Sequence, residues 1–414
     1  MPCVSASQAF LREKRSRKTP ICCNLGKMDK KTLKKLIALG VLTALFVALS
    51  VLCNNSSVCE FFATTFSRAW IAFFGTVFGW LPFSVFELFL VLAILGAVTF
   101  VVFVFVFLAK RRWKKLVSLT LAVAIAVMCF LNVYTATASF AYNRNPLPQE
   151  IYTEFNSEQF TYEDAVDLAE KLVQKANFAY ENTNRDQNGN IVYPFTFNQL
   201  SDVLAQEYKR LDSDYFSSYT PRGKQIANKW IMSQLHITGV FFAPFGEANV
   251  NGNETSLYLP LTLAHEMAHA KGVMKEFQAD LVAMYVLLTS NNVYLQYGAY
   301  VKAAAYAIGL VRLFPNSQEK CVELNKLLNV GIVQEKRNYN EFYGQFTLLD
   351  DLGEFFNDIY LKLQKQEGGT DSYVKPEETQ GTGEKDDFGN EIVQIISFSG
   401  MQNLLINLYK QQLI

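Results

Sequence analysis

Three long runs of apolar residues dominate the first third of the chain. They cover residues 36–53, 84–108 and 116–140, and Glu87 is the only charged residue within them. A helix that crosses a bilayer needs about 20 apolar residues, whereas buried helices of soluble proteins are usually shorter. The pattern therefore predicts three transmembrane helices. A cleaved signal peptide is the alternative for the first run, but "LCNNSSVCEFF" is a poor cleavage site.

The segment between the first two runs has a different pattern. Residues 66–83, "FSRAWIAFFGTVFGWLPF", are rich in aromatic side chains but are interrupted by two glycines and by Pro82. Tryptophan favours the level of the lipid headgroups. We therefore predict an interfacial segment on the outer leaflet, with Trp70 and Trp80 at the membrane surface.

After residue 140, apolar residues recur mostly with helical spacing among polar ones. Thr161 and Asp164 have the spacing of a capping box and predict a helix over residues 162–180. Residues 236–261 are rich in β-branched and aromatic residues and predict a small β element. Further helices are predicted over residues 262–271, 276–289, 297–313, 317–330, 350–366 and 399–412. Residues 365–391 are polar and predict a long loop.

These patterns predict a mainly α-helical fold with three regions. Residues 1–35 form a basic tail, residues 36–140 the three-helix transmembrane region, and residues 141–414 an α-rich domain with a small β element. Residues 1–27 lack periodicity, so they form either a disordered tail or an over-extended start before Met28.

Local charge predicts how the chain is oriented. The net charge of the 414 residues is zero, which disfavours nucleic acid as a partner, but lysine and arginine cluster in residues 12–35 and 110–115. Cytoplasmic loops carry an excess of these residues. We therefore expect a multi-pass protein of the cell membrane with a cytoplasmic N-terminus and residues 141–414 outside. The sparse cysteines suit a bacterial envelope protein better than a disulfide-rich secreted one.

The candidate chemistry lies in "LAHEMAHAKGVMKEFQAD", residues 263–280. His265 and His269 are four residues apart, so on a helix they share one face and can bind one zinc ion. Glu266 points about 100 degrees away, where a carboxylate can reach a water molecule at the metal. A helix with ordinary surface histidines is the alternative. The apolar entry "SLYLPLTLA" disfavours it, because a buried carboxylate needs a partner.

A zinc site of this kind needs a third protein ligand. Gly272 can end the helix and turn the chain, so that Glu276 returns to the metal. Asp280 is then expected to orient a ligand histidine, and it remains an alternative third ligand.

"EFQAD" after the HExxH motif resembles the third-ligand region of the membrane metallopeptidases that trim prenylated proteins, although its spacing is different. A wider resemblance rests on "WLPFSVFELF", "YNRNPL", "ITGVFFAPFGEANVN", "LPLTLAHEMAHAKG" and "YGAYVKAAAYAI". Together these segments resemble an uncharacterised family of bacterial multi-pass membrane proteins, known only as a domain of unknown function. The resemblance implies a zincin-like outer domain with a zinc-peptidase-like site.

Other polar residues are weaker candidates for the site. Glu247 and Asn249 could lie on an edge strand that pairs with an extended peptide, or could simply belong to turns. His236 could stabilise an oxyanion, but a lone histidine before a strand is more often structural. Tyrosines 294, 297 and 300 are more often packing residues.

The sequence therefore predicts a membrane-anchored zinc metallopeptidase of the cell envelope. His265, His269 and Glu276 would bind Zn²⁺, and Glu266 would activate water for attack on a peptide or protein substrate. A catalytically inactive zinc-binding scaffold or interaction module is the alternative.

Overall fold

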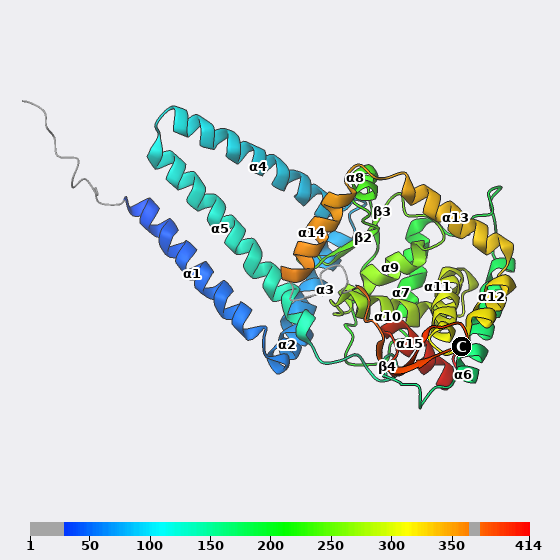
Figure 1. The fold of residues 1–414 in the computed structure, drawn as a ribbon. Helices are drawn as coiled ribbons and strands as arrows, with labels where there is room; N and C mark the ends of the chain where they lie inside the picture. Colours follow the sequence, from blue (N-terminus) through cyan, green and yellow to red (C-terminus); the bar gives the residue numbers. More distant parts are fainter. Residues whose placement is uncertain (1–28, 364–372) are drawn as a thin grey trace, which may run out of the picture.

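A computed structural model describes residues 29–363 and 373–414. Most of the predicted basic tail (residues 1–28) and the start of the predicted polar loop (residues 365–372) lie outside these residues. The chain has an elongated part made of long helices and a rounded, helix-rich C-terminal part, residues 141–414 (Figure 1).

The elongated part contains the three predicted apolar helices, α1 (Lys30–Leu52), α4 (Val85–Ala109) and α5 (Trp113–Thr137). Two polar contacts join α1 to α5. Lys35 Nζ donates to the Ser118 carbonyl (2.7 Å), and Asn132 Nδ2 donates to the Leu42 carbonyl (3.0 Å). Neither α1 nor α4 has a buried residue. An apolar surface of this extent is typical of helices in contact with lipid.

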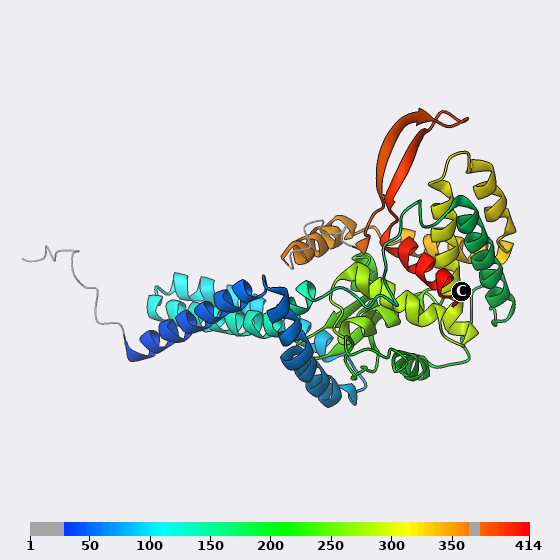
Figure 2. The same cartoon turned by 90° about the horizontal axis from the view of Figure 1, so that it is seen from below.

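Among the described residues, four helical stretches rather than the predicted three are long and apolar enough to cross a membrane. The additional stretch, Ser56–Gly79, consists of α2 (Ser56–Phe62), the π-helical turn η1 (Ala63–Ser67) and α3 (Arg68–Gly79). Its glycines do not break it. Gly75 lies against Gly246 and Tyr219, where a Cβ atom would overlap the tyrosine ring. The stretch runs across the ends of α1, α4 and α5, beside the C-terminal part (Figures 1 and 2).

The C-terminal part is built mainly from helices. Their bounds are η2 (Ser139–Asn143), α6 (Tyr162–Glu181), α7 (Phe197–Tyr208), α8 (Lys229–Gln234), α9 (Leu259–Ala270), α10 (Glu276–Leu288), α11 (Val293–Arg312), α12 (Gln318–Leu327), α13 (Val330–Gly344), α14 (Asp350–Leu363) and α15 (Gly400–Lys410). The predicted capping box of α6 is confirmed, because Thr161 and Asp164 bond reciprocally. Leucines of α6 and alanines of α11 pack in the core beside α9, α10 and α15.

Two small β elements complete the fold. The first has strands β1 (Lys224–Ile226), β2 (Gly239–Phe242) and β3 (Glu247–Asn251) in the order β1-β3-β2. β3 pairs in parallel with β1 and antiparallel with β2. The second is a hairpin of β4 (Glu378–Lys385), which lies within the region predicted as a polar loop, and β5 (Glu391–Ser397), which begins at the last residue of that region. Every residue of β4 is exposed, so no alternation of apolar residues marked it as a strand.

Candidate metal centre

Helix α9 and the turn that follows it bring the HExxH motif to the start of α10. The helix begins with a proline in its first turn and ends at Ala270, and Gly272 adopts a φ of 93°. Glycine tolerates this left-handed conformation, so it can reverse the chain within a short turn. Arg144 secures the turn, because its Nη1 donates to the Gly272 carbonyl (2.9 Å). Glu276 is then the first residue of α10.

Three side chains converge on one point at this junction. His265 Nε2 lies 3.1 Å and His269 Nε2 lies 3.5 Å from the same atom, Glu276 Oε2. All three ligand atoms lie within 4.8 Å of one another. Tetrahedral zinc, with bonds of about 2.0–2.1 Å, holds its donor atoms about 3.3–3.4 Å apart. The donor types suit zinc, and the two distances to Glu276 Oε2 are close to this spacing, so these residues could hold a zinc ion with a fourth position left for water.

The Nδ1 atoms of both histidines, which face away from Glu276, have partners that orient the imidazole rings. His265 Nδ1 lies 2.9 Å from Asp280 Oδ1, and His269 Nδ1 lies 2.7 Å from the Val273 carbonyl oxygen. A carbonyl only accepts, so His269 Nδ1 carries the proton and Nε2 can present a lone pair. Asp280 thus occupies the orienting position, and Glu276 is the carboxylate that faces both Nε2 atoms.

Glu266 lies beside this cluster and against the strand β2. A Cβ atom at position 239 would overlap the Glu266 carboxylate, so Gly239 makes room for it. Gly239 was not among the residues predicted for the site. The glycine within the otherwise β-forming "ITGVFF" was the available signal, since glycine inside a strand often marks close approach of another group.

Burial and the histidine–carboxylate contacts shift the ionisation of the site. The side chains of His265, His269 and Glu276 are only 12%, 7% and 8% exposed. Burial opposes a charged His265, but hydrogen bonds to Asp280 and Glu276 outweigh it and raise its pKa. Burial also disfavours a charged Glu276, yet the neighbouring histidines lower its pKa to about 2. The cluster is organised around positive charge, which a divalent cation supplies equally well.

Glu266 shows the opposite shift. Burial is the main cause and raises its pKa to about 7, although the two histidines oppose the change. A carboxyl group with this pKa can both accept and return a proton near neutral pH.

A family model described as "Protein of unknown function (DUF3810)" matches residues 62–376, more than half of the chain. The chain belongs to this family. The DUF3810 match includes most of the apolar helices and the whole HExxH cluster. The predicted resemblance to a family of unknown function is therefore confirmed, together with the helices of a membrane protein. No curated protein and no solved structure matches the chain.

The predicted edge-strand role of Glu247 and Asn249 is wrong for this DUF3810 chain. Both residues lie on β3, which is the central strand of its sheet and is buried along its whole length. Strand order depends on pairing between distant segments, which the local pattern could not reveal. Glu247 instead accepts hydrogen bonds from the backbone N–H groups of Val85 (3.2 Å) and Phe86 (2.9 Å) and forms a buried ion pair with Lys224.

Replacing Glu247 with alanine should lower stability by about 3–5 kcal/mol, because it leaves the buried Lys224 ammonium without its partner. Chemical unfolding of the full chain in detergent would measure this loss. Asp202→Ala, which removes an exposed ion pair with Arg222, is the matched control and should cost about 1 kcal/mol or less. Equal effects of the two changes would contradict the structural role of Glu247.

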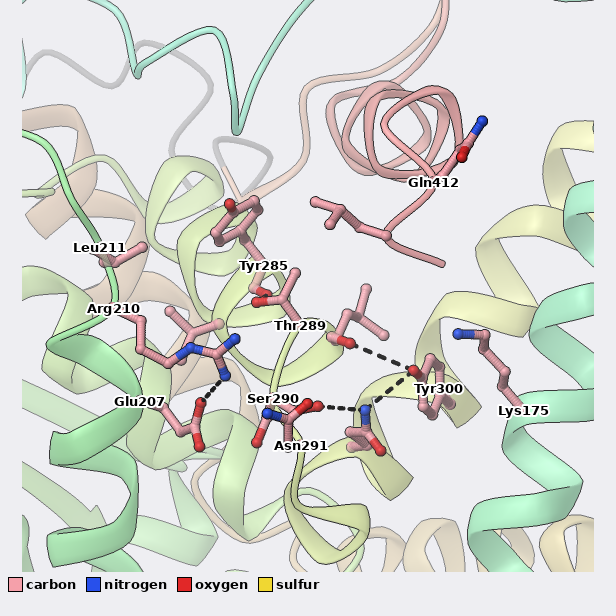
Figure 3. Close-up of a pocket in the computed structure, with 14 residues that line it drawn as sticks. Lys175, Glu207, Arg210, Leu211, Tyr285, Thr289, Ser290, Asn291, Tyr300 and Gln412 are labelled. Carbon is pink, nitrogen blue, oxygen red and sulfur yellow. Dashed lines mark hydrogen bonds and ion pairs between the residues drawn. The ribbon is translucent and has the colours of Figure 1, made fainter.

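The weaker candidates, His236 and the tyrosines of α11, make contacts away from the HExxH cluster. His236 Nε2 bonds to the Phe346 carbonyl, and Tyr297 donates to Glu335. Tyr300 lines a cavity of about 470 Å³ at the opposite end of α10 from Glu276 (Figure 3). None of His265, His269 and Glu276 lines this cavity, and several polar groups of the cavity bond to one another, such as Arg210 to Glu207 (2.8 Å). The cluster of His265, His269 and Glu276 is therefore the stronger candidate for a functional site.

Proposed function

We propose that this protein is a membrane-anchored zinc metallopeptidase that hydrolyses peptide bonds on the outer side of the membrane. The main support is the convergence of His265 Nε2 and His269 Nε2 on Glu276 Oε2, with Glu266 beside them. Two imidazoles and one carboxylate form a common set of catalytic zinc ligands, which leaves one position open. A zincin-like arrangement of the C-terminal part belongs to the same proposal.

His265, His269 and Glu276 would hold a zinc ion, which would supply Lewis acidity to a peptide carbonyl and to a water molecule at the open position. Glu266 accepts a proton from the water molecule as its oxygen attacks the carbonyl carbon. When the C–N bond breaks, Glu266 returns that proton to the leaving amine nitrogen. Asp280 keeps His265 oriented during these steps, and the Val273 carbonyl does the same for His269.

Strand β2, rather than β3, is the edge at which we place the substrate. It pairs only with β3 within its sheet, and Gly239, Val240 and Phe241 are partly exposed. Gly239 contacts Glu266, and the Phe241 ring lies 6.0 Å from the His269 ring. An extended peptide added to this edge would pass directly beside the cluster.

The direct test is hydrolysis of a randomised peptide library by the purified full chain in detergent. We expect cleavage that stops when a chelator removes the metal and returns when zinc is added, because zinc is the only Lewis acid in the proposed mechanism. Mass spectrometry of the products measures both changes. Cleavage that persists in the chelator would contradict a zinc-dependent mechanism.

The proposed orientation places residue 112 in the cytoplasm and residue 200 outside. It follows if α1, α4 and α5 cross the membrane and Ser56–Gly79 does not. If all four stretches crossed, the basic residues 110–115 would lie outside, against the usual distribution of lysine and arginine. Reporter fusions at residues 112 and 200 should therefore show cytoplasmic and external activity, respectively. The reverse result would contradict this orientation and place the site in the cytoplasm.

A further inference from the structure

Strand β2 connects the metal cluster directly to the membrane helices. Phe241 contacts the His269 ring, and the next residue, Phe242, points to the opposite side of the strand. The Phe242 ring lies 4.8 Å and 5.6 Å from two phenylalanines of α4, Phe86 and Phe89. It lies 6.2 Å from Phe130 of α5. One strand therefore contacts the metal site on one face and the apolar helices on the other.

Two further sets of contacts fix the position of the cluster relative to the apolar helices. Glu87, in the first turn of α4, accepts hydrogen bonds from the backbone N–H groups of Ala227 (2.9 Å) and Asn228 (2.7 Å), just after β1. Arg144 bonds both to Glu60 of α2 (2.6 Å) and to the Gly272 carbonyl in the turn between the metal ligands. The site is thus attached to the membrane helices through both its sheet and its turn.

The short distance between the cluster and the apolar helices determines which polypeptide segments can reach the cluster. A strand rises about 3.3 Å per residue, so Gly239, which contacts Glu266, lies at most about 10 Å further from the apolar helices than Phe242 does. The polar headgroup layer adds roughly 5–8 Å on each side of the hydrocarbon core. A polypeptide leaving the bilayer in an extended conformation would cover this upper limit of about 15–18 Å with about five residues.

Helix α8 adds an apolar surface at the same level. It begins directly after the backbone held by Glu87, and its Trp230 and Ile231 are 52% and 41% exposed. Exposed tryptophan beside aliphatic residues is typical of protein surfaces that lie in the headgroup region.

We propose that the site cleaves membrane-anchored polypeptides in the segment that emerges directly from the outer face of the bilayer, within about ten residues of the anchor. This inference rests on the proposed peptidase function and specifies its substrate class. Anchoring in the same bilayer keeps the segment at a high effective concentration beside β2. Free peptides lack this advantage and should be poorer substrates.

The experiment presents one randomised peptide library in two forms to the full chain in nanodiscs. In one form the peptides are free, and in the other they extend from the outer end of a single apolar transmembrane helix in the same nanodiscs. We expect cleavage of the anchored form to be at least about tenfold faster, with cut sites within about ten residues of the anchor. Glu266→Gln provides the background, and mass spectrometry locates each cut.

Each outcome decides a different question. Equal rates for both forms, with cuts at any distance from the anchor, would overturn the inference and leave the peptidase function standing. Cleavage of neither form above the Glu266→Gln background would refute the peptidase function, and the inference with it.

Variants of α8 supply a second measurement. Trp230→Ser with Ile231→Ser should slow cleavage of the anchored form by about threefold or more and leave the free form unchanged, since membrane contact alone is weakened. Phe178→Ser with Val330→Ser removes two other exposed apolar residues, 63% and 81% exposed. They belong to α6 and α13, which lie on the side of the C-terminal part opposite the membrane helices (Figure 1). This control should alter neither rate. An equal loss for both substrate forms in the α8 variant would count against the inference.

Discussion

Glu266→Gln should lower the rate of peptide hydrolysis by about 100- to 10,000-fold, the usual contribution of general-base catalysis. Glutamine has nearly the same size and polarity as glutamate, so it can occupy the space beside Gly239. It cannot accept the proton of an attacking water molecule. Because Glu266 is not among the three converging ligand groups, zinc content and folding should persist in the variant.

The matched control is Glu181→Gln, which removes an exposed carboxylate at the end of α6 and should leave the rate unchanged. Initial rates on a peptide cleaved by the wild type, with zinc measured on the same samples, separate the possible roles of Glu266. Loss of zinc from the variant would make Glu266 a ligand or a support of the ligands. Equal rates in wild type and variant would remove it as the base.

The local parts of this molecule were predictable from its sequence. Hydrophobicity and length alone located α1, α4 and α5, because a helix in lipid needs a continuous apolar run. The capping box of α6 and the turn at Gly272 were predictable for a similar reason, since each depends on a few neighbouring residues. The shared face of His265 and His269 follows from helical periodicity.

The parts that depend on distant segments were not predictable. The sequence left Glu276 and Asp280 as alternative third ligands, and the choice depends on which ring nitrogen of His265 each carboxylate faces. Likewise, only strand pairing shows that β3 is central and that β2 forms the edge. Gly75 reads as a helix breaker in isolation, but in the fold it permits α3 to pack closely against Gly246.

His265→Ala combined with His269→Ala should reduce bound zinc from about one ion per chain to nearly none. The double change removes two of the three converging donor groups, and the remaining Glu276 carboxylate offers one ligand where a zinc site needs at least three. Zinc is measured by elemental mass spectrometry on the full chain in detergent, after dialysis to remove loosely bound ions. Circular dichroism of the same samples checks that the helices persist.

His236→Ala is the matched control for this experiment, because His236 is the one remaining histidine of the chain and is absent from the cluster. Its ring bonds to the Phe346 carbonyl, far along the chain from α9 and α10. This variant should keep the wild-type zinc content. Unchanged zinc in the double variant would place the metal elsewhere, whereas loss in both variants would point to a general disturbance of the fold. Loss in the double variant alone would assign the metal to α9, since only the imidazoles that face Glu276 would have been removed.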